Sequence, residues 1–409
     1  MMTERLYYDD AHLMEFEARV LAVEKLNDSR VAVLLDRTAF YPTGGGQPSD
    51  TGTLGEARVI ECIDAEDRIL HIIEGPLPEI GQHIVGKIDR LRRLTHLQQH
   101  TGQHILSQAF QKLFGAETRG FRIMDRISEI DLALAAPCEE MIARAIELAN
   151  QIVWEDRPIK IHYLAAREAS RLALRREPTR GGILRLVEIE DFDLTPCGGT
   201  HAKRTGEVGL ILARSWERAK RMTRLRFVAG IRALADYTQI NRIAHRVALM
   251  LSSERDDLAD RVARLLEENK GLAKRVRELE TQLAHREIEE MLTTAPRRAD
   301  GAGVIARLFP QRSPEALKSL ALAARSFPKT VALLGSYEAD SAYLIFARSA
   351  DLDEEMNRLI ERACAEIGGR GGGRADFAQG GGKGDLKRVE ATLQMIACEL
   401  LGETHKLET

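Results

Sequence analysis

Two short strings carry side chains that could bind a metal ion. In the first, His100-Thr-Gly-Gln-His104, two imidazoles are four residues apart within a stretch of helical periodicity. Residues at i and i+4 share one helix face, so both rings could chelate a divalent metal. Thr101 occupies the position where a zinc metalloprotease motif has glutamate. Taken alone, the string is also consistent with an ordinary polar pair on a helix.

The second string, Cys197-Gly-Gly-Thr-His201, has two glycines between its thiol and its imidazole. Such a tight loop can turn both side chains toward one point. Three imidazoles and a thiolate together favour Zn²⁺ over Mg²⁺ or Ca²⁺. The alternative is a coincidental cysteine in a glycine turn, but two ligand pairs within one inferred domain favour a metal site. We therefore expect one Zn²⁺ per chain.

The third string covers residues 38–52 and contains three consecutive glycines. Glycine allows backbone amides to approach a ligand closely, and Gln47 offers both a donor and an acceptor. The string does not end in the Gly-Lys-Ser/Thr of a Walker A loop, and the later Gly-Lys383-Gly fails the same test.

The elements that must position these strings change character along the chain. Up to about residue 88, short β-branched runs alternate with glycine turns and predict a small β-barrel. From Asp89 the apolar period becomes helical, and mixed strands and helices then continue to about Gly230. The expected fold class is α+β, with an N-terminal barrel (1–88) followed by an α+β domain (89–235).

A helical segment is expected at 236–295. Leucines recur every seven residues, and the positions four residues after them complete a heptad pattern with an asparagine at one a site. These d and a residues are Leu251, Leu258, Leu265, Leu272 and Leu279, followed by Arg255, Val262, Asn269, Val276 and Leu283. A coiled coil that pairs two chains and one long helix folded against its own domain both fit. The remainder, 296–409, reads as an α/β domain that contains a glycine loop at 368–385.

Composition excludes several classes of protein. The 409 residues carry 59 Lys+Arg against 62 Asp+Glu, a net charge of −3, which excludes a uniformly basic nucleic-acid coat. Aromatic residues make up 5%, too few for a base-stacking platform. The five scattered cysteines fit a reducing compartment. No apolar run approaches a spanning helix and no signal segment is visible, so we expect a soluble cytoplasmic protein without a membrane partner.

Taken together, FYPTGGGQPSDTG, HTGQH and CGGTH resemble the AlaX trans-editing proteins and the editing domain of alanyl-tRNA synthetases. The string GRGGGRADFAQGGG resembles the C-terminal domain of the synthetase, which is also appended to DHH phosphoesterases. The order of parts is similar to the long form of AlaX. The resemblance implies that 89–235 is a zinc-containing editing domain and that 296–409 binds tRNA or mediates oligomerisation. A homodimer through the coiled coil is possible on this basis.

The resemblance also implies roles for individual residues. His100, His104, Cys197 and His201 would hold the zinc ion. Gln47 and Thr38, with Gly45 and Gly46, would line the substrate pocket, and Gln47, Thr38 and Cys197 would be the catalytic set. One departure is Gly102, where synthetase editing domains usually have alanine. We expect it to face away from the metal.

The implied reaction is hydrolysis of the ester that joins serine, or glycine, to tRNA(Ala). A pocket that hydrogen-bonds the serine hydroxyl would reject alanine, and Thr38 is the candidate for that bond. Four protein ligands would close a tetrahedral zinc site, so zinc could act in the reaction or only position the substrate. The alternatives are a zinc-stabilised RNA-binding module and a hydrolase of another ester without tRNA specificity.

Basic residues for tRNA contact are expected in two places. One run follows the CGGTH string, and the other candidates lie in the glycine loop; a solvated surface explains such runs equally well. The candidates are Arg218, Lys220, Arg221, Arg224, Arg374 and Lys383.

Overall fold

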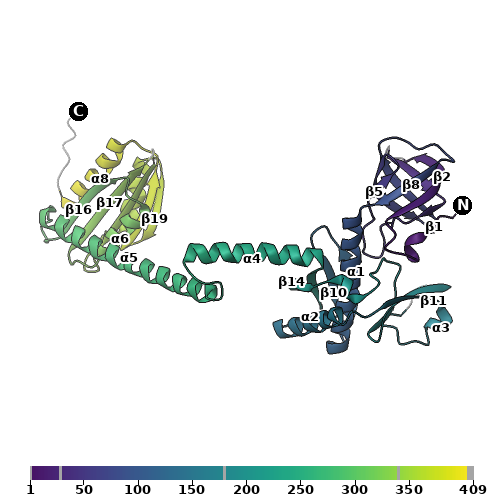
Figure 1. The fold of residues 1–409 in the computed structure, drawn as a ribbon. Helices are drawn as coiled ribbons and strands as arrows, with labels where there is room; N and C mark the ends of the chain where they lie inside the picture. The colour runs from purple at the N-terminus through teal and green to yellow at the C-terminus, as the bar shows by residue number, and fades with distance from the viewer. Residues whose placement is uncertain (1, 27–29, 178–180, 339–340, 403–409) are drawn as a thin grey trace. The chain divides into compact units, whose positions relative to one another are not determined.

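The computed structural model describes residues 2–26, 30–177, 181–338 and 341–402. The chain divides into two compact units, Met1–Met250 and Leu251–Thr409, each of which is described by itself. Both units mix helices with sheets, so the expected α+β class is confirmed (Figure 1). Among the described residues, no helix combines the length and apolar character needed to span a bilayer.

The N-terminal strands close into a barrel in the order β2-β3-β7-β6-β5-β8. Along the first half of β2, buried and exposed residues alternate, as expected for a strand with one face toward a core. The core contains Phe16, Val20, Leu35 and Phe40. The barrel strands are β2 (Glu15–Lys25), β3 (Val31–Leu35), β5 (Gly52–Leu54), β6 (Ala57–Ala65), β7 (Arg68–Glu74) and β8 (His83–Ile88). Beside them, β1 (Glu4–Arg5) pairs in parallel with β4 (Arg37–Thr38), and η1 (Leu6–Tyr8) lies between β1 and β2 in the chain.

A long helix, α1 (Arg90–Phe114), follows the barrel and leads into the second part of this unit. It begins where Asp89 accepts a hydrogen bond from Arg92 N–H and ends at Gly115 in the left-handed conformation. The apolar face of α1 packs with α2 and with the four-stranded sheet β14-β15-β10-β9 around one core. Their bounds are β9 (Thr118–Ile123), β10 (Ser128–Leu132), α2 (Glu139–Trp154), η2 (Thr205–Val208), β14 (Ile211–Ala219) and β15 (Met222–Ala229).

A second, three-stranded sheet carries the chain into the CGGTH string. Its order is β11-β12-β13, and all its pairs are antiparallel. The elements are β11 (Ile159–Ala165), α3 (Ala166–Ala169), β12 (Ile183–Ile189) and β13 (Asp193–Pro196). Because β13 ends at Pro196, the next residue, Cys197, stands at the edge of this sheet.

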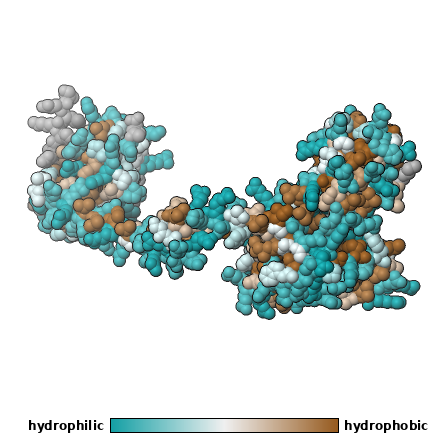
Figure 2. All heavy atoms as spheres, in the orientation of Figure 1, coloured by the Kyte–Doolittle hydropathy of each residue, from teal (hydrophilic) through white to brown (hydrophobic). Residues whose placement is uncertain are grey.

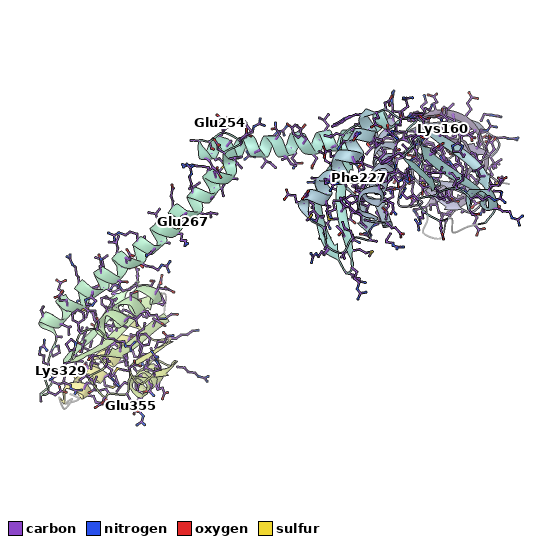
Figure 3. The ribbon with its side chains drawn as sticks, turned by 90° about the horizontal axis from the view of Figure 1, so that it is seen from below. Lys160, Phe227, Glu254, Glu267, Lys329 and Glu355 are labelled. Atoms are coloured by element: carbon purple, nitrogen blue, oxygen red, sulfur yellow. The ribbon has the colours of Figure 1, made fainter. Side chains whose placement is uncertain are left out.

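The helical segment is interrupted, contrary to the single long helix considered above. It consists of α4 (Ile231–Leu251) and α5 (Leu258–Thr294), with Ser252 at φ 48° and Glu254 in the break (Figure 3). Serine and aspartate side chains compete for backbone hydrogen bonds, and the intervening sequence, Ser-Ser-Glu-Arg-Asp-Asp, is rich in both. The heptad positions from Leu258 to Leu283 therefore all lie on α5.

The second unit contains a five-stranded sheet in the order β16-β17-β18-β20-β19. One face packs against α5 and α6, and the other against α7 and α8. The first two strands are parallel, and the remaining pairs are antiparallel. The bounds are β16 (Gly303–Pro310), α6 (Pro314–Ala324), β17 (Thr330–Glu338), β18 (Ser341–Arg348), α7 (Met356–Glu366), β19 (Arg370–Arg374), β20 (Phe377–Gly382) and α8 (Leu386–Leu401).

The prediction of a glycine loop at 368–385 is wrong, because most of this segment forms the hairpin β19–β20. Helix α7 lies directly on these two strands. A Cβ atom at Gly380 would stand 2.5 Å from Cys364 Sγ, and one at Gly371 would stand 2.9 Å from it. Gly371 and Gly380 are required because the helix leaves no room for side chains on that face.

We expect Gly380→Ala to lower the stability of the second unit, because overpacking of this kind costs about 1–3 kcal/mol. Gly372→Ala is the matched control, since a Cβ there meets nothing within 4 Å. Differential scanning calorimetry of the full chain measures both variants. A transition temperature for Gly380→Ala equal to that of the control would contradict this account of the hairpin.

Candidate metal centre

The HTGQH and CGGTH strings lie side by side in the structure. His100 and His104 come from the middle of α1, and Cys197 and His201 come from the loop after β13; their ligand atoms all lie within 4.8 Å of one another. Cys197 Sγ is 3.4 Å from His100 Nε2 and 3.3 Å from His201 Nε2. One sulfur and three imidazole nitrogens form the donor set that zinc favours, so these residues fit the metal that the sequence predicts.

Each histidine is oriented by a different side chain at Nδ1. Gln47 Oε1 lies 2.7 Å from His100 Nδ1, and Asp193 Oδ2 lies 3.3 Å from His104 Nδ1. Thr101 Oγ1 lies 3.3 Å from His201 Nδ1. A partner at Nδ1 leaves Nε2 as the nitrogen available to a metal and fixes the direction of the ring.

Gln47 is held in place by both sides of the centre. It is buried, and its Nε2 donates to Thr200 Oγ1 at 2.8 Å, while the Thr200 N–H donates to its Oε1 at 3.3 Å. The loop that carries it lies against β9, because Ile123 N–H donates to Gly46 O at 2.8 Å. Gly46 has φ +83°, and a Cβ there would lie 2.3 Å from Phe121 O. This glycine permits the close approach of the loop to the strand.

A buried ion pair attaches the same loop to α1. Arg93 and Asp50 are fully buried, and Arg93 Nε lies 3.1 Å from Asp50 Oδ2. Arg93 also donates to the carbonyls of Ala11 and Ala39, both at 2.6 Å, and Asp50 accepts from Tyr41 N–H at 2.7 Å. The segments around Ala11, Ala39 and Asp50 are thus fixed relative to α1, the helix that carries the two histidines.

Arg185 holds the CGGTH loop from the other side. Its Nη1 donates to Cys197 O at 2.7 Å and to Gly199 O at 3.1 Å. Gly199 lies against the His100 ring, where a Cβ would stand 2.1 Å from Cε1. The second glycine of the string is therefore required by the approach of the loop to α1.

The pKa values of Cys197 and His201 are shifted toward the protonation states that a metal binds. Burial would raise the pKa of the Cys197 thiol, but His100 and His201 outweigh it and hold that pKa well below its ordinary value. Burial lowers the pKa of His201 to about 3. Burial would raise the pKa of Asp193, but Arg175, at 2.7 Å, keeps it below the usual range. Burial would lower the pKa of His104, but Asp193 and Cys197 outweigh it and raise that pKa above its ordinary value. Zinc binds thiolate and neutral imidazole, so Cys197 and His201 are prepared for it, whereas His104 would have to release its proton on binding.

Three family models match separate parts of the chain. A model described as the threonyl and alanyl tRNA synthetase second additional domain matches residues 184–226, one for class II (A) tRNA synthetases matches 2–92, and a DHHA1 domain matches 301–400. An alanyl-tRNA editing protein AlaX-L from Pyrococcus horikoshii is 32% identical over 404 residues, which cover 97% of this chain and 96% of that protein. The chain belongs to the AlaX editing family.

Alanine–tRNA ligases are also similar over a part of their length. Those from Pyrobaculum neutrophilum and Pyrobaculum aerophilum are 32% and 33% identical over 96% and 97% of this chain, but the chain spans only 44% of each ligase. The C-Ala domain of the Aquifex aeolicus synthetase is 26% identical, with a TM-score of 0.23, over 24% of this chain and 91% of that domain.

In this AlaX-family chain a cavity of about 900 Å³ opens from the metal centre. His100, His104 and Cys197 form part of its wall. Of the other residues expected to bind substrate, Gly45 lines it, whereas Gln47, Gly46 and Thr38 are not among the described residues that do. Gln47 instead contacts the back of the His100 ring.

Thr38 lies in the barrel, where its hydroxyl is already engaged. It accepts a hydrogen bond from Phe40 N–H at 3.1 Å and lies 2.8 Å from His71 Nε2. Since His71 Nδ1 donates to the Val33 carbonyl at 3.0 Å, the Thr38 hydroxyl is the donor to Nε2. Burial lowers the pKa of His71 to about 4, which keeps this ring neutral.

Gly102 faces away from the metal. A Cβ at this position would lie 3.1 Å from Ala229 Cβ and 3.4 Å from Val208 Cγ1, on the side of α1 that packs into the core.

The basic candidates differ in what surrounds them. Arg224 Nε lies 2.8 Å from Asp131 Oδ1, so much of its charge is neutralised within the sheet. Arg374 lies 3.5 Å from Asp376. In the described part of the chain, Arg218, Lys220 and Arg221 are exposed at the β14–β15 turn without a carboxylate in ion-pair range, and Lys383 is exposed before α8.

Asp193, Thr101 and Arg185 were not predicted from the sequence as parts of the centre. Asp193 and Arg185 both lie outside the recognised strings, so no local motif marks them. Only Thr101 and Thr200 carried a signal, since both lie inside the recognised strings.

We expect Gln47→Leu to weaken zinc binding by about 10- to 100-fold, because loss of a side chain that orients a metal ligand has this effect. The exposed Gln151→Leu, on α2, is the control for the chemical change. Competition with a chromogenic chelator measures the zinc affinity of both. Equal affinities would mean that Gln47 does not orient His100.

Proposed function

We propose that this chain is a trans-editing hydrolase that deacylates tRNA(Ala) mischarged with serine, and also with glycine, in the cytoplasm. The observation that carries the proposal is the His₃Cys cluster, of which His100, His104 and Cys197 line a cavity of about 900 Å³, within a chain that matches an AlaX-L protein along its length. The cavity is at the upper end of the range for small-molecule pockets, which suits a terminal adenosine with its amino acid.

The proposal includes one Zn²⁺ held by His100, His104, Cys197 and His201. A zinc ion there supplies Lewis acidity toward the ester or lowers the pKa of a water molecule. The chain's own residues keep the ligands in position. Gln47, Asp193 and Thr101 each orient one imidazole, so we assign Gln47 a positioning role and Cys197 the role of the anionic ligand.

The deciding experiment is the deacylation of Ser-, Gly- and Ala-tRNA(Ala) by zinc-loaded protein, beside Cys197→Ala. We expect loss of the seryl and glycyl esters, sparing of the alanyl ester, and at least a 100-fold lower rate for the variant, in the range of a lost metal interaction. Gly372→Ala in the second unit is the control. Zinc and tRNA binding without cleavage would support a zinc-stabilised RNA-binding module. Cleavage of esters without dependence on tRNA would support a general esterase.

We propose that Arg218, Lys220 and Arg221, with Arg374 and Lys383, contact tRNA phosphates, and that Arg224 contributes less because Asp131 neutralises it. Replacing Arg218, Lys220 and Arg221 by alanine should reduce the slope of log affinity against log salt by about 0.7–0.9 for each phosphate that is no longer neutralised. Arg224→Ala is the comparison. Binding measured across a salt series would contradict the assignment if the slope did not change.

We also propose a homodimer through α5. Its heptad residues are exposed in the single chain, as for Leu272 at 67% and Leu265 at 39%, and apolar residues lie among hydrophilic ones on the surface of the helical segment (Figure 2). Leu272→Lys should shift the mass in sedimentation equilibrium from two chains to one, whereas Lys274→Ala, on the opposite side of the helix, should not. A wild-type chain that sediments as a monomer at micromolar concentration would exclude this dimer.

A further inference from the structure

Gln103 is a residue of the cavity wall to which the function described so far assigns nothing. It lies on α1 between His100 and His104 and lines the same cavity as both. Its side chain is 6% exposed. Because three residues of helix rise about 4.5 Å, its amide lies within one turn of both imidazoles.

The amide of Gln103 is held in one orientation. Its Nε2 donates to Ser107 Oγ at 2.7 Å, one turn further along α1. Thr118 Oγ1, on β9, lies 2.7 Å from the same Ser107 oxygen. Ser107 is buried, so this chain of hydrogen bonds fixes the glutamine between helix and strand. Its Oε1 remains as a carbonyl acceptor without a donor from the described residues.

The other polar groups of the cavity wall are less suited to accept a hydrogen bond from a ligand beside the metal centre. Arg175 and Arg176 can only donate, and Glu117 is paired with Arg119 at 2.7 Å. Gln111 lies seven residues beyond His104, about 10 Å along the helix. Thr118 and Thr195 also line the wall and can accept, but Gln103 is the neutral acceptor that lies on α1 between the two histidines.

Serine, glycine and alanine esters differ in the hydrogen bonds that they can donate to such an acceptor. All of them carry the α-ammonium, but only the seryl ester carries a side-chain hydroxyl. We propose, resting on the editing function above, that Gln103 Oε1 accepts a hydrogen bond from the hydroxyl of the bound serine and thereby sets the preference for serine over alanine. An alanyl ester would leave this oxygen unpaired once the substrate fills the cavity, and that penalty is the larger part of discrimination by polar pockets.

The proposal transfers to Gln103 the role that the sequence suggested for Thr38. The hydroxyl of Thr38 already donates to His71, and the residue lies outside the described cavity wall. Gln103 has an open acceptor in that wall.

The test compares the deacylation of Ser-, Gly- and Ala-tRNA(Ala) by Gln103→Met, which keeps the length but removes the acceptor, and by Gln103→Glu, which keeps an acceptor. Gln103→Met should lower the rate for serine relative to glycine by about tenfold, the factor that corresponds to 1.4 kcal/mol. Gln103→Glu should retain the preference for serine. Ser107→Ala, which frees the amide, should give a smaller loss confined to serine.

The outcomes separate the possibilities. An equal fall for serine and glycine at unchanged zinc content would overturn the proposal, because it indicates a general effect on substrate binding or folding. A ratio altered by Thr38→Val but not by Gln103→Met would restore the role to Thr38. If wild-type protein spares all three esters, the editing function itself fails, and this proposal fails with it.

Discussion

The geometry of the metal centre depends on the buried ion pair between Arg93 and Asp50. Burying two opposite charges costs free energy unless their remaining hydrogen-bonding groups also find partners. Here the carbonyls of Ala11 and Ala39 accept from Arg93, and the N–H of Tyr41 donates to Asp50. Removing one partner from such a pair typically costs about 3–5 kcal/mol. The pair fixes the barrel loop on α1 less than two turns before His100, and so decides where Gln47 can reach.

Further contacts then position the ligands of the centre relative to this ion pair. The loop brings Gln47 to His100, and the absence of side chains at Gly46 and Gly199 lets the loop and the CGGTH string approach β9 and α1. Arg185 then holds the string by its carbonyls, while Asp193, neutralised by Arg175, orients His104. The sulfur and the three imidazoles therefore have few orientations open to them, which is the condition for preorganised metal binding.

Much of this could be predicted from the sequence, and the limits have physical reasons. The ligands were predictable because i, i+4 spacing and a Cys-Gly-Gly-Thr-His turn are local geometry. Asp193 and Arg185 were not, because their roles arise from strand pairing over long sequence distances. Thr38 shows that a polar residue within a recognised string can have its hydrogen bonds satisfied inside a core. The hairpin β19–β20 shows that the structure of a glycine run depends on what packs against it, and the break before Leu258 shows that serine and aspartate can end a helix inside a heptad pattern.

The orientation of the three histidines from three separate segments also has a consequence for folding. Gln47 belongs to the barrel loop, Thr101 to α1 and Asp193 to the strand before the CGGTH string, so the complete centre exists only after these parts have docked. A ligand that binds only the docked state stabilises that state by mass action. A metal ion bound by these four residues would thus stabilise the docked arrangement of the barrel loop and α1, in addition to any part it took in chemistry.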